Sequence, residues 1–206
     1  MKTALLSSTY FGPVQWYQKL NRYDNILIEQ HDSFIKQTFR NRCLIATPNG
    51  QQALSVPTKP QEGKGGYTST AISSHGNWRH VHWNALKSAY GESPFFEYYA
   101  DDIKPFFEKD WQYLYDFNMD ICRCLCSLLD ITPHISLTDH YITQEEAKES
   151  GMDDFRDVIR PKHPLPDPDF SPRKYYQVYG QRHGFLPNMS ILDLLFNMGN
   201  ESVLWL

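Results

Sequence analysis

The chain has 206 residues, of which 41% are hydrophobic and 15% aromatic, enough for one large domain with a complete core. Its formal net charge of -4 argues against a nucleic-acid partner, so any recognition of phosphate must be local. No apolar run approaches the length that crosses a bilayer, and the first one ends at Leu6, too early for a signal peptide. We therefore expect a cytoplasmic protein without a membrane span.

The first 30 residues predict a strand, a helix and a second strand. Residues 3–8 and 26–29 are the expected strands, and Val14, Tyr17 and Leu20 recur between them at helical spacing after Pro13. Such a unit places the two strands parallel, with a right-handed crossover. Ligands of parallel sheets bind beyond the carboxyl ends of the strands, so we expect a site near residues 8–13 and 29–34.

A basic segment leads into a predicted hairpin. Pro48-Asn49-Gly50 separates apolar runs at residues 43–46 and 53–56, and Asn-Gly in that position is a strong hairpin signal. Just before it stand Lys36, Arg40 and Arg42. In a strand, Arg40 and Arg42 point to one face, where two guanidinium groups match phosphate or carboxylate oxygens. The alternative is an ordinary exposed strand with cross-strand ion pairs.

The middle of the chain predicts further helices and strands. The expected elements are a surface loop at residues 61–66, a strand at 68–74, helices ending near Tyr90 and at 94–103, a helix from Pro105, a helix at 111–129 and a last strand at 134–137. The helix at 111–129 has the clearest 3.6-residue period. We interpret its three cysteines, Cys122, Cys124 and Cys126, as packing residues.

The composition changes after residue 143. Residues 144–157 are acidic with a possible short helix, and residues 160–172 hold five of the 13 prolines, which indicates an extended surface connection, not a second domain. Residues 175–186 are aromatic, with a strand-like run before a short turn at residues 182–184, and Ser190 opens the last helix with a capping-box pattern. Together these features predict a single α/β domain over residues 1–206, with a mixed sheet, an added hairpin and surrounding helices.

Two residues near the end of the second strand are candidates for acid-base chemistry. Glu29 and His31 are two apart and share a side if the strand continues, so the carboxylate could orient the imidazole. A structural hydrogen bond is the alternative. We expect Tyr10 and Asn41 to orient a substrate, and Arg182 and His183, in a turn before Pro187, to complete the site from the far end of the chain.

Other chemistries are less well supported. Cys43 follows Arg42 and could be an acyl-transfer nucleophile, but strand alternation turns it toward the side of Ile45, which favours burial. His80 and His82 are two apart on a helix, a spacing that does not converge on a metal ion. The sequence therefore predicts no metal site, and it assigns no cofactor and no oligomeric state.

These residues together resemble the WbqC-like family. The resemblance rests on the strand, the Tyr10-x-x-Pro13 turn and helix, and on Asp24, Lys36-Gln37, Asn41-Arg42, Pro48-Asn49-Gly50, Leu54-Ser55-Val56-Pro57, Trp78, His82-Trp83, Ala89-Tyr90-Gly91 and Pro94-Phe95-Phe96. Residues 182–185 and 191–197 look like its Bacteroidetes branch. The chain departs from the family pattern at Ser8-Thr9, where Gln-Pro is usual, and at Cys43, where Asn is common. The first departure weighs against a ligand role for the first loop, and the second against any role that needs that amide.

The family takes its name from the product of a polysaccharide O-antigen gene cluster, so the resemblance implies surface-polysaccharide biosynthesis. The leading hypothesis is an enzyme, such as a transferase, that acts on a nucleotide-linked or phosphorylated sugar held by Arg40 and Arg42. One alternative is a non-catalytic assembly protein that binds an activated sugar or a partner enzyme. Another is a thiol acyltransferase that uses Cys43.

Overall fold

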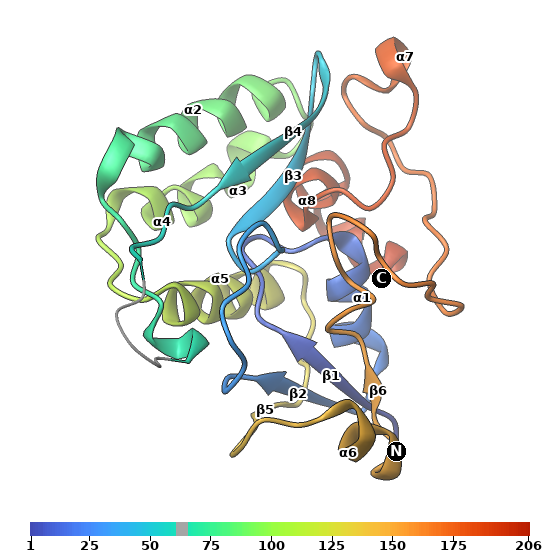
Figure 1. Ribbon diagram of the computed structural model, residues 1–206. Helices are drawn as coiled ribbons and strands as arrows, with labels where there is room; N and C mark the ends of the chain where they lie inside the picture. Colours follow the sequence, from blue (N-terminus) through green and yellow to red (C-terminus); the bar gives the residue numbers. More distant parts are fainter. Residues whose placement is uncertain (61–65) are drawn as a thin grey trace.

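The βαβ unit predicted at the amino terminus is present and forms the centre of the fold. In the computed structural model, which describes residues 1–60 and 66–206, β1 (Thr3–Ser7) and β2 (Asn25–Glu29) pair in parallel, with α1 (Val14–Arg22) between them (Figure 1). β5 (Ile135–Leu137) joins β2, and β6 (Asp153–Asp154) joins β1, both in parallel. The sheet order is therefore β5-β2-β1-β6, and all four carboxyl ends share one edge.

The hairpin predicted from Asn-Gly is also confirmed. β3 (Arg42–Thr47) and β4 (Gly50–Ser55) are antiparallel, with Arg42 opposite Ser55. Gly50 has a φ angle of +96, a backbone conformation that residues with a Cβ atom rarely adopt. The two strands form a separate ribbon that stands away from the parallel sheet (Figure 1), so the single α/β domain holds a parallel sheet and an antiparallel hairpin.

Helices surround both sheets. Those of the described chain, besides α1, are α2 (Trp78–Tyr90), α3 (Phe96–Ile103), α4 (Pro105–Glu108), α5 (Leu114–Leu128), α6 (Gln144–Glu149), α7 (Gly180–His183), α8 (Ile191–Met198) and the 3-10 turns η1 (Tyr67–Ser69), η2 (His75–Asn77) and η3 (Gly199–Trp205). The predicted helices at 94–103 and 111–129 begin two and three residues later than expected. None of the described helices is long and apolar enough to cross a membrane.

Two predicted strand segments did not form, and one strand was not predicted. Residues 68–74 form η1 and two isolated bridges, at Ala71 and Ile72, because the segment pairs with single residues instead of a neighbouring strand. β6 was missed, since two consecutive aspartates carry no strand signal. The run at 175–186 contains α7 instead of a strand. Of the loop expected at 61–66, residues 61–65 lie outside the described residues.

The segment after β6 is the extended connection that its prolines predict. Residues 155–179 contain no helix or strand and pass over α1 (Figure 1). A buried ion pair fastens this segment: Lys19 Nζ of α1 lies 2.8 Å from Asp167 Oδ2, with the side chains 1% and 4% exposed. Gln15 Nε2 donates to the same oxygen at 2.8 Å, and the ammonium of Lys19 lies over the Phe155 ring. The connection is thus held against the core.

Candidate functional site

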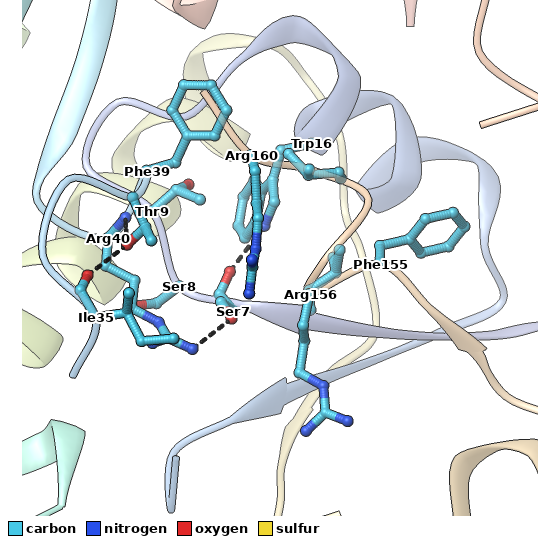
Figure 2. Close-up of a pocket in the computed structure, with 13 residues that line it drawn as sticks. Ser7, Ser8, Thr9, Trp16, Ile35, Phe39, Arg40, Phe155, Arg156 and Arg160 are labelled. Carbon is cyan, nitrogen blue, oxygen red and sulfur yellow. Dashed lines mark hydrogen bonds between the residues drawn. The ribbon is translucent and has the colours of Figure 1, made fainter. Parts of the chain in front are cut away.

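A cleft opens at the carboxyl end of β1, between the loop before the hairpin and the segment after β6 (Figure 2). The room that it offers a water-sized group is about 20 Å³, within a hollow of about 360 Å³ that includes open solvent. Its ionisable lining residues are all arginines, Arg40, Arg156 and Arg160, so we call it the arginine cleft. The described residues that line it are Leu6, Ser7, Ser8, Thr9, Trp16, Ile35, Thr38, Phe39, Arg40, Phe155, Arg156, Ile159 and Arg160.

The tip of β1 supplies hydroxyl groups to the cleft. The carbonyl of Ser7 accepts a hydrogen bond from the Trp16 indole at 2.9 Å, which fixes the strand end against α1. The Ser8 hydroxyl is engaged elsewhere, 2.6 Å from the Tyr67 hydroxyl. Thr9 Oγ1 lies so close to Gly12 that a Cβ at position 12 would be 2.3 Å from it. Glycine at that position therefore allows the Thr9 side chain its place.

Arg40 reaches the same strand tip from the loop before β3. Its Nη2 donates to Ser7 Oγ at 3.0 Å and pairs with Asp32, and its Nη1 donates to the Ser33 carbonyl at 2.8 Å. The guanidinium also lies 5.1 Å from the centre of the Tyr67 ring. With the side chain 4% exposed, these contacts hold the guanidinium in one orientation beside the cleft.

Two further arginines come from the segment after β6. Arg156 is buried and donates to Asp154 at 2.9 and 2.6 Å and to Glu29 Oε2 at 3.3 Å, so its role is to bind the strand ends together. Arg160 pairs with Asp157, and the two side chains are 37% and 36% exposed. In Figure 2, Arg40 and Arg160 flank Ser7, whereas the Arg156 guanidinium points away from it.

Three buried polar atoms of the cleft have no hydrogen-bond partner within the described part of the chain: Thr9 Oγ1, Arg40 Nε and Arg160 Nε. Such atoms also occur singly elsewhere, for example Asn41 Oδ1, but here they belong to residues around one hollow. An unsatisfied buried polar group costs about 1–3 kcal/mol, so such groups are rare without a water, an ion or a ligand to satisfy them. The arginine cleft is therefore our candidate site.

The amino terminus of α1 does not contribute to this site. Although a helix following a β-strand commonly offers its first N–H groups to phosphate, Val14 N donates to the Met189 carbonyl at 3.0 Å and Gln15 N to Asn188 Oδ1 at 2.9 Å. The carboxyl-terminal segment thus occupies these donors. An anion in the arginine cleft is therefore not held by these two N–H groups.

The predicted pairing of the Glu29 carboxylate with the His31 ring is wrong. Glu29 accepts from the backbone N–H of His31 at 2.7 Å, from Thr138 Oγ1 and Ile142 N at 3.0 Å, and from Arg156. The His31 ring instead lies with Nε2 3.0 Å from the Thr138 carbonyl, which makes that nitrogen the donor. The chain turns at residue 30, so strand alternation does not continue to His31, and neither residue lines the arginine cleft.

Tyr10 points into the core and not toward a substrate site. Its side chain is fully buried, and its hydroxyl lies 2.8 Å from His82 Nδ1. Burial lowers the pKa of His82 to about 4, so the ring is neutral at physiological pH. Phe11, at φ +41, turns the chain sharply at this point and is itself fully buried, which draws Tyr10 into the aromatic core.

The predicted convergence of Arg40 and Arg42 does not form. Arg40 lies in the turn before β3, so the two-residue alternation of a strand does not apply to the pair. Arg42 Nε donates to Ser55 Oγ on the paired strand at 2.9 Å, which is the ordinary cross-strand contact considered as the alternative. Asn41 is buried and donates to the Val56 carbonyl at 3.0 Å, and Lys36 is exposed outside the cleft lining.

Arg182 and His183 lie at the opposite end of the hairpin from the arginine cleft. They belong to α7, which sits beside the hairpin tip (Figure 1), and His183 Nε2 is 3.1 Å from the Thr47 carbonyl. Neither residue is among those that line the cleft. The contact with the end of the parallel sheet that we expected for them is not formed; His183 contacts the hairpin instead.

Cys43 is buried, on the same side of β3 as Ile45, as strand alternation predicts. Burial raises the pKa of its thiol far above the ordinary value, which leaves almost no thiolate at neutral pH. This environment does not support an acyl-transfer nucleophile. Within the described residues, no group of three or more His, Cys, Asp or Glu side chains is arranged to hold a metal ion.

Ser7, Thr9, Arg156 and Arg160 are cleft residues that the sequence did not single out. Arg156 and Arg160 are four apart in a segment whose neighbours, acidic on one side and proline-rich on the other, predict a solvated connection. Only the pairing of β6 with β1 brings this segment to the strand tip. The one signal that pointed to Thr9 was its position after the first strand, where ligands of parallel sheets bind.

The chain belongs to a recognised family. The model of the WbqC-like protein family matches residues 8–159, and the chain is a member of that family. The match ends before residues 182–185 and 191–197, on which the likeness to the Bacteroidetes branch rests. The chain is also 25% identical to the uncharacterized protein Rv1507c of Mycobacterium tuberculosis (strain ATCC 25618 / H37Rv), over 98% of this chain and 95% of that protein. No solved structure matches it significantly.

Proposed function

We propose that the arginine cleft binds the phosphate of a phosphorylated or nucleotide-linked sugar, and that the protein serves surface-polysaccharide biosynthesis of the O-antigen type in the cytoplasm. The biological context comes from the family name. The binding role is supported by one observation above all: Thr9, Arg40 and Arg160, each of which has a buried polar atom without a described partner, line one hollow. Guanidinium and hydroxyl donors are the groups that recognise phosphate oxygens.

The arrangement favours binding over acid-base catalysis. The described cleft lining contains no histidine, carboxylate or thiol that could move a proton. Glu29 is already saturated with hydrogen bonds, and the His31 ring is turned to the Thr138 carbonyl. What the lining offers is three guanidinium groups held by carboxylates, of which the Arg160–Asp157 pair is the most exposed and the easiest for an anion to exchange.

Sugar transfer is a second candidate function, and the arginines favour it specifically. A glycosyl group leaves its phosphate with a negative charge developing on oxygen, and fixed guanidinium donors stabilise such a charge. For this function we expect Arg40 to stabilise the leaving phosphate, because its contacts with Ser7, Asp32 and Ser33 fix the orientation of its guanidinium. Phosphorus NMR of nucleotide sugars incubated with the protein and candidate acceptors tests for turnover, and unchanged spectra leave binding as the function.

Calorimetric titration with sugar phosphates and nucleotide sugars tests the binding role. We expect Arg160→Gln to weaken binding by about tenfold or more, the scale of one charge-assisted hydrogen bond. Arg42→Gln is the matched control, because Arg42 donates to Ser55 on the hairpin and does not line the cleft. Equal losses in the two variants, or no binding by the unmodified protein to any of these compounds, would refute the proposal.

A further inference from the structure

We propose that Cys122 and Cys126 of α5 form a binding site for a soft, thiophilic metal ion of the Cu(I) class. Neither residue lines the arginine cleft, so this site is independent of the proposed function. The sequence predicts that the cysteines of α5 are packing residues, and the structure gives two of them a second property, because both line one hollow. Three features point to an ion there: the distance between the sulfurs, the room beside them and the charges around them.

The two sulfur atoms lie together on one side of α5. Cys122 Sγ is 3.9 Å from Cys126 Sγ, as residues four apart on a helix allow. A bond between a metal ion and a thiolate is about 2.3 Å long, so an ion that binds both sulfurs at their present separation has an angle of about 115° between its two bonds. This angle lies between the tetrahedral and the trigonal values. The ion therefore fits without a change in the helix.

A disulfide between the same two residues fits less well. A disulfide needs its Cβ atoms about 3.5–4.5 Å apart, whereas residues four apart on a helix hold them about 5–6 Å apart. Backbone hydrogen bonds also fix this end of α5: Leu129 N donates to the Leu125 carbonyl at 2.9 Å, and Ile131 N donates to the Cys126 carbonyl at 3.0 Å. Formation of the disulfide would distort the helix, whereas an ion bridges the thiols where they stand.

The hollow beside the thiols has room for an ion and for its remaining ligands. It offers a water-sized group about 490 Å³, against about 20 Å³ in the arginine cleft. Cys122 and Cys126 are 2% and 7% exposed, so the thiols belong to its inner wall. An ion with two protein ligands keeps one or two positions that a small thiol or a water molecule fills from this side. The described residues that line the hollow are Cys122, Arg123, Cys126, Ser127, Asp130, Ile131, Thr132, Pro133 and Ile135.

The donor set selects a soft ion. Thiolates prefer ions such as Cu(I) over Mg²⁺ and Ca²⁺, which prefer oxygen ligands. Two sulfurs do not complete the four-ligand shell of a structural zinc site, and the described part of the chain has no group of three or more His, Cys, Asp or Glu side chains arranged to hold an ion. Cu(I), which binds with two or three sulfur ligands, fits this pair best.

The charges around the thiols are compatible with such a complex. The pKa of Cys122 is raised by its contact with Cys126 and by burial, so it is a neutral thiol when no ion is bound. Binding of Cu(I) breaks both S–H bonds, releases two protons and leaves a dithiolate complex with one negative charge. Arg123 lines the same hollow and can balance this charge, because its pair with Asp120 is exposed. Asp130 is exposed as well, so water screens its carboxylate.

Anaerobic titration of the reduced full chain with Cu(I), supplied as its complex with the coloured chelator bicinchoninate, tests this site. We expect the protein to take one Cu(I) ion per chain from the chelator and to gain the ultraviolet charge-transfer absorption of a Cu(I)–thiolate. Cys122→Ala and Cys126→Ala should each weaken binding by about 100-fold or more, because one sulfur remains. Cys124→Ala is the matched control on the same helix: Cys124 does not line this hollow, and its loss should leave the affinity unchanged.

A second measurement on the unmodified protein does not depend on the folding of any variant. Phenylarsine oxide condenses with two neighbouring thiols, forming two As–S bonds and releasing its oxygen as water. We expect one adduct per chain, on the peptide that contains Cys122 and Cys126, and we expect the modified protein to take up no Cu(I). No transfer of Cu(I) to the unmodified protein, equal affinity in Cys122→Ala and Cys124→Ala, or full Cu(I) uptake by the arsenical adduct would each overturn the proposal.

Discussion

The arginine cleft and the base of the hairpin each contain an arginine and a serine, yet they differ in how their polar atoms are satisfied. At the hairpin base, which we define as Tyr10, Arg42, Ser55 and His82, the tyrosine bonds the histidine at 2.8 Å and the arginine bonds the serine at 2.9 Å. In the cleft, buried atoms of Thr9, Arg40 and Arg160 lack such partners. Residue type alone does not distinguish the two regions; the unpartnered polar atoms of the cleft do.

The difference has a physical origin in how each region is held. At the hairpin base the Arg42–Ser55 contact is local, because β3 and β4 are neighbours in sequence and their register places the two residues opposite each other. The cleft is assembled from segments far apart in the chain, and its second wall depends on the proline-rich connection that Lys19 and Asp167 fasten to α1. Disrupting each holding interaction should therefore have a different consequence.

The largest expected effect follows from breaking the Lys19–Asp167 pair. Lys19→Met leaves the Asp167 carboxylate buried without its cation, which should lower the free energy of unfolding by about 3–5 kcal/mol. Urea denaturation measures this loss. The double variant Lys19→Met/Asp167→Leu should recover most of it, because the stranded charge is gone. A single variant within about 1 kcal/mol of the unmodified protein would show that the connection is not fastened there.

The next effect concerns pH and the hairpin base. Burial lowers the pKa of His82 to about 4, from about 6.5 in an unfolded chain, so between these values the unfolded state binds more protons. Stability should therefore fall by up to about 3 kcal/mol as the pH decreases from 6.5 to 4. Urea denaturation of the unmodified protein and of His82→Gln across this pH range measures the contribution of His82 to the free energy of unfolding. The same pH dependence in both proteins would contradict this prediction.

A buried carboxylate acts in the opposite direction and must be separated from this term. Burial raises the pKa of Asp193 to about 6, although Tyr175 and Gln177 donate to it and counteract the rise. Here the folded state binds more protons between about pH 3.8 and 6, so the stability contributed by Asp193 is lost as the pH rises through that window. Asp193→Asn should therefore make the acid-induced loss from His82 steeper.

The sequence anticipated the fold better than the site. Asn49-Gly50 and the spacing of Val14, Tyr17 and Leu20 are local signals, and the hairpin and βαβ unit follow from them. The carboxyl end of β1 was also expected as the ligand end, and the cleft lies there. The partners of Glu29 could not be deduced, because Thr138, Ile142 and Arg156 come from more than 100 residues away.

Arg40 and Arg42 show why the site could not be assigned residue by residue. Strand alternation applies only within the strand, and β3 begins at Arg42. That boundary, one or two residues from where it was expected, decides whether a guanidinium faces the cleft or the paired strand. This boundary depends on the contacts of Arg40 with Ser7 and Asp32, which form only in the folded chain and cannot be deduced from local sequence.

A smaller effect should distinguish charge from geometry at Arg40. Arg40→Lys keeps the positive charge near Asp32 but loses the fork that reaches Ser7 and Ser33 together. We expect the affinity for glucose 1-phosphate to fall by about tenfold, or about 1.4 kcal/mol, with the charge retained. Calorimetry of this variant beside Arg40→Gln gives the comparison. Equal binding by Arg40→Lys and the unmodified protein would mean that charge alone matters.

The smallest effect should come from Arg42, and it bears most directly on the comparison of the two regions. Arg42 Nε has a complete partner in Ser55 Oγ and lies on a partly exposed strand, so Arg42→Ala removes one neutral-acceptor hydrogen bond at the surface. The free energy of unfolding should change by about 0.5 kcal/mol or less, and sugar-phosphate affinity should not change. Urea denaturation and calorimetry on the same preparation give both values. A loss of affinity in Arg42→Ala as large as that in Arg160→Gln would place the anion at the hairpin base. Water would then be the partner of the unpartnered polar atoms in the cleft.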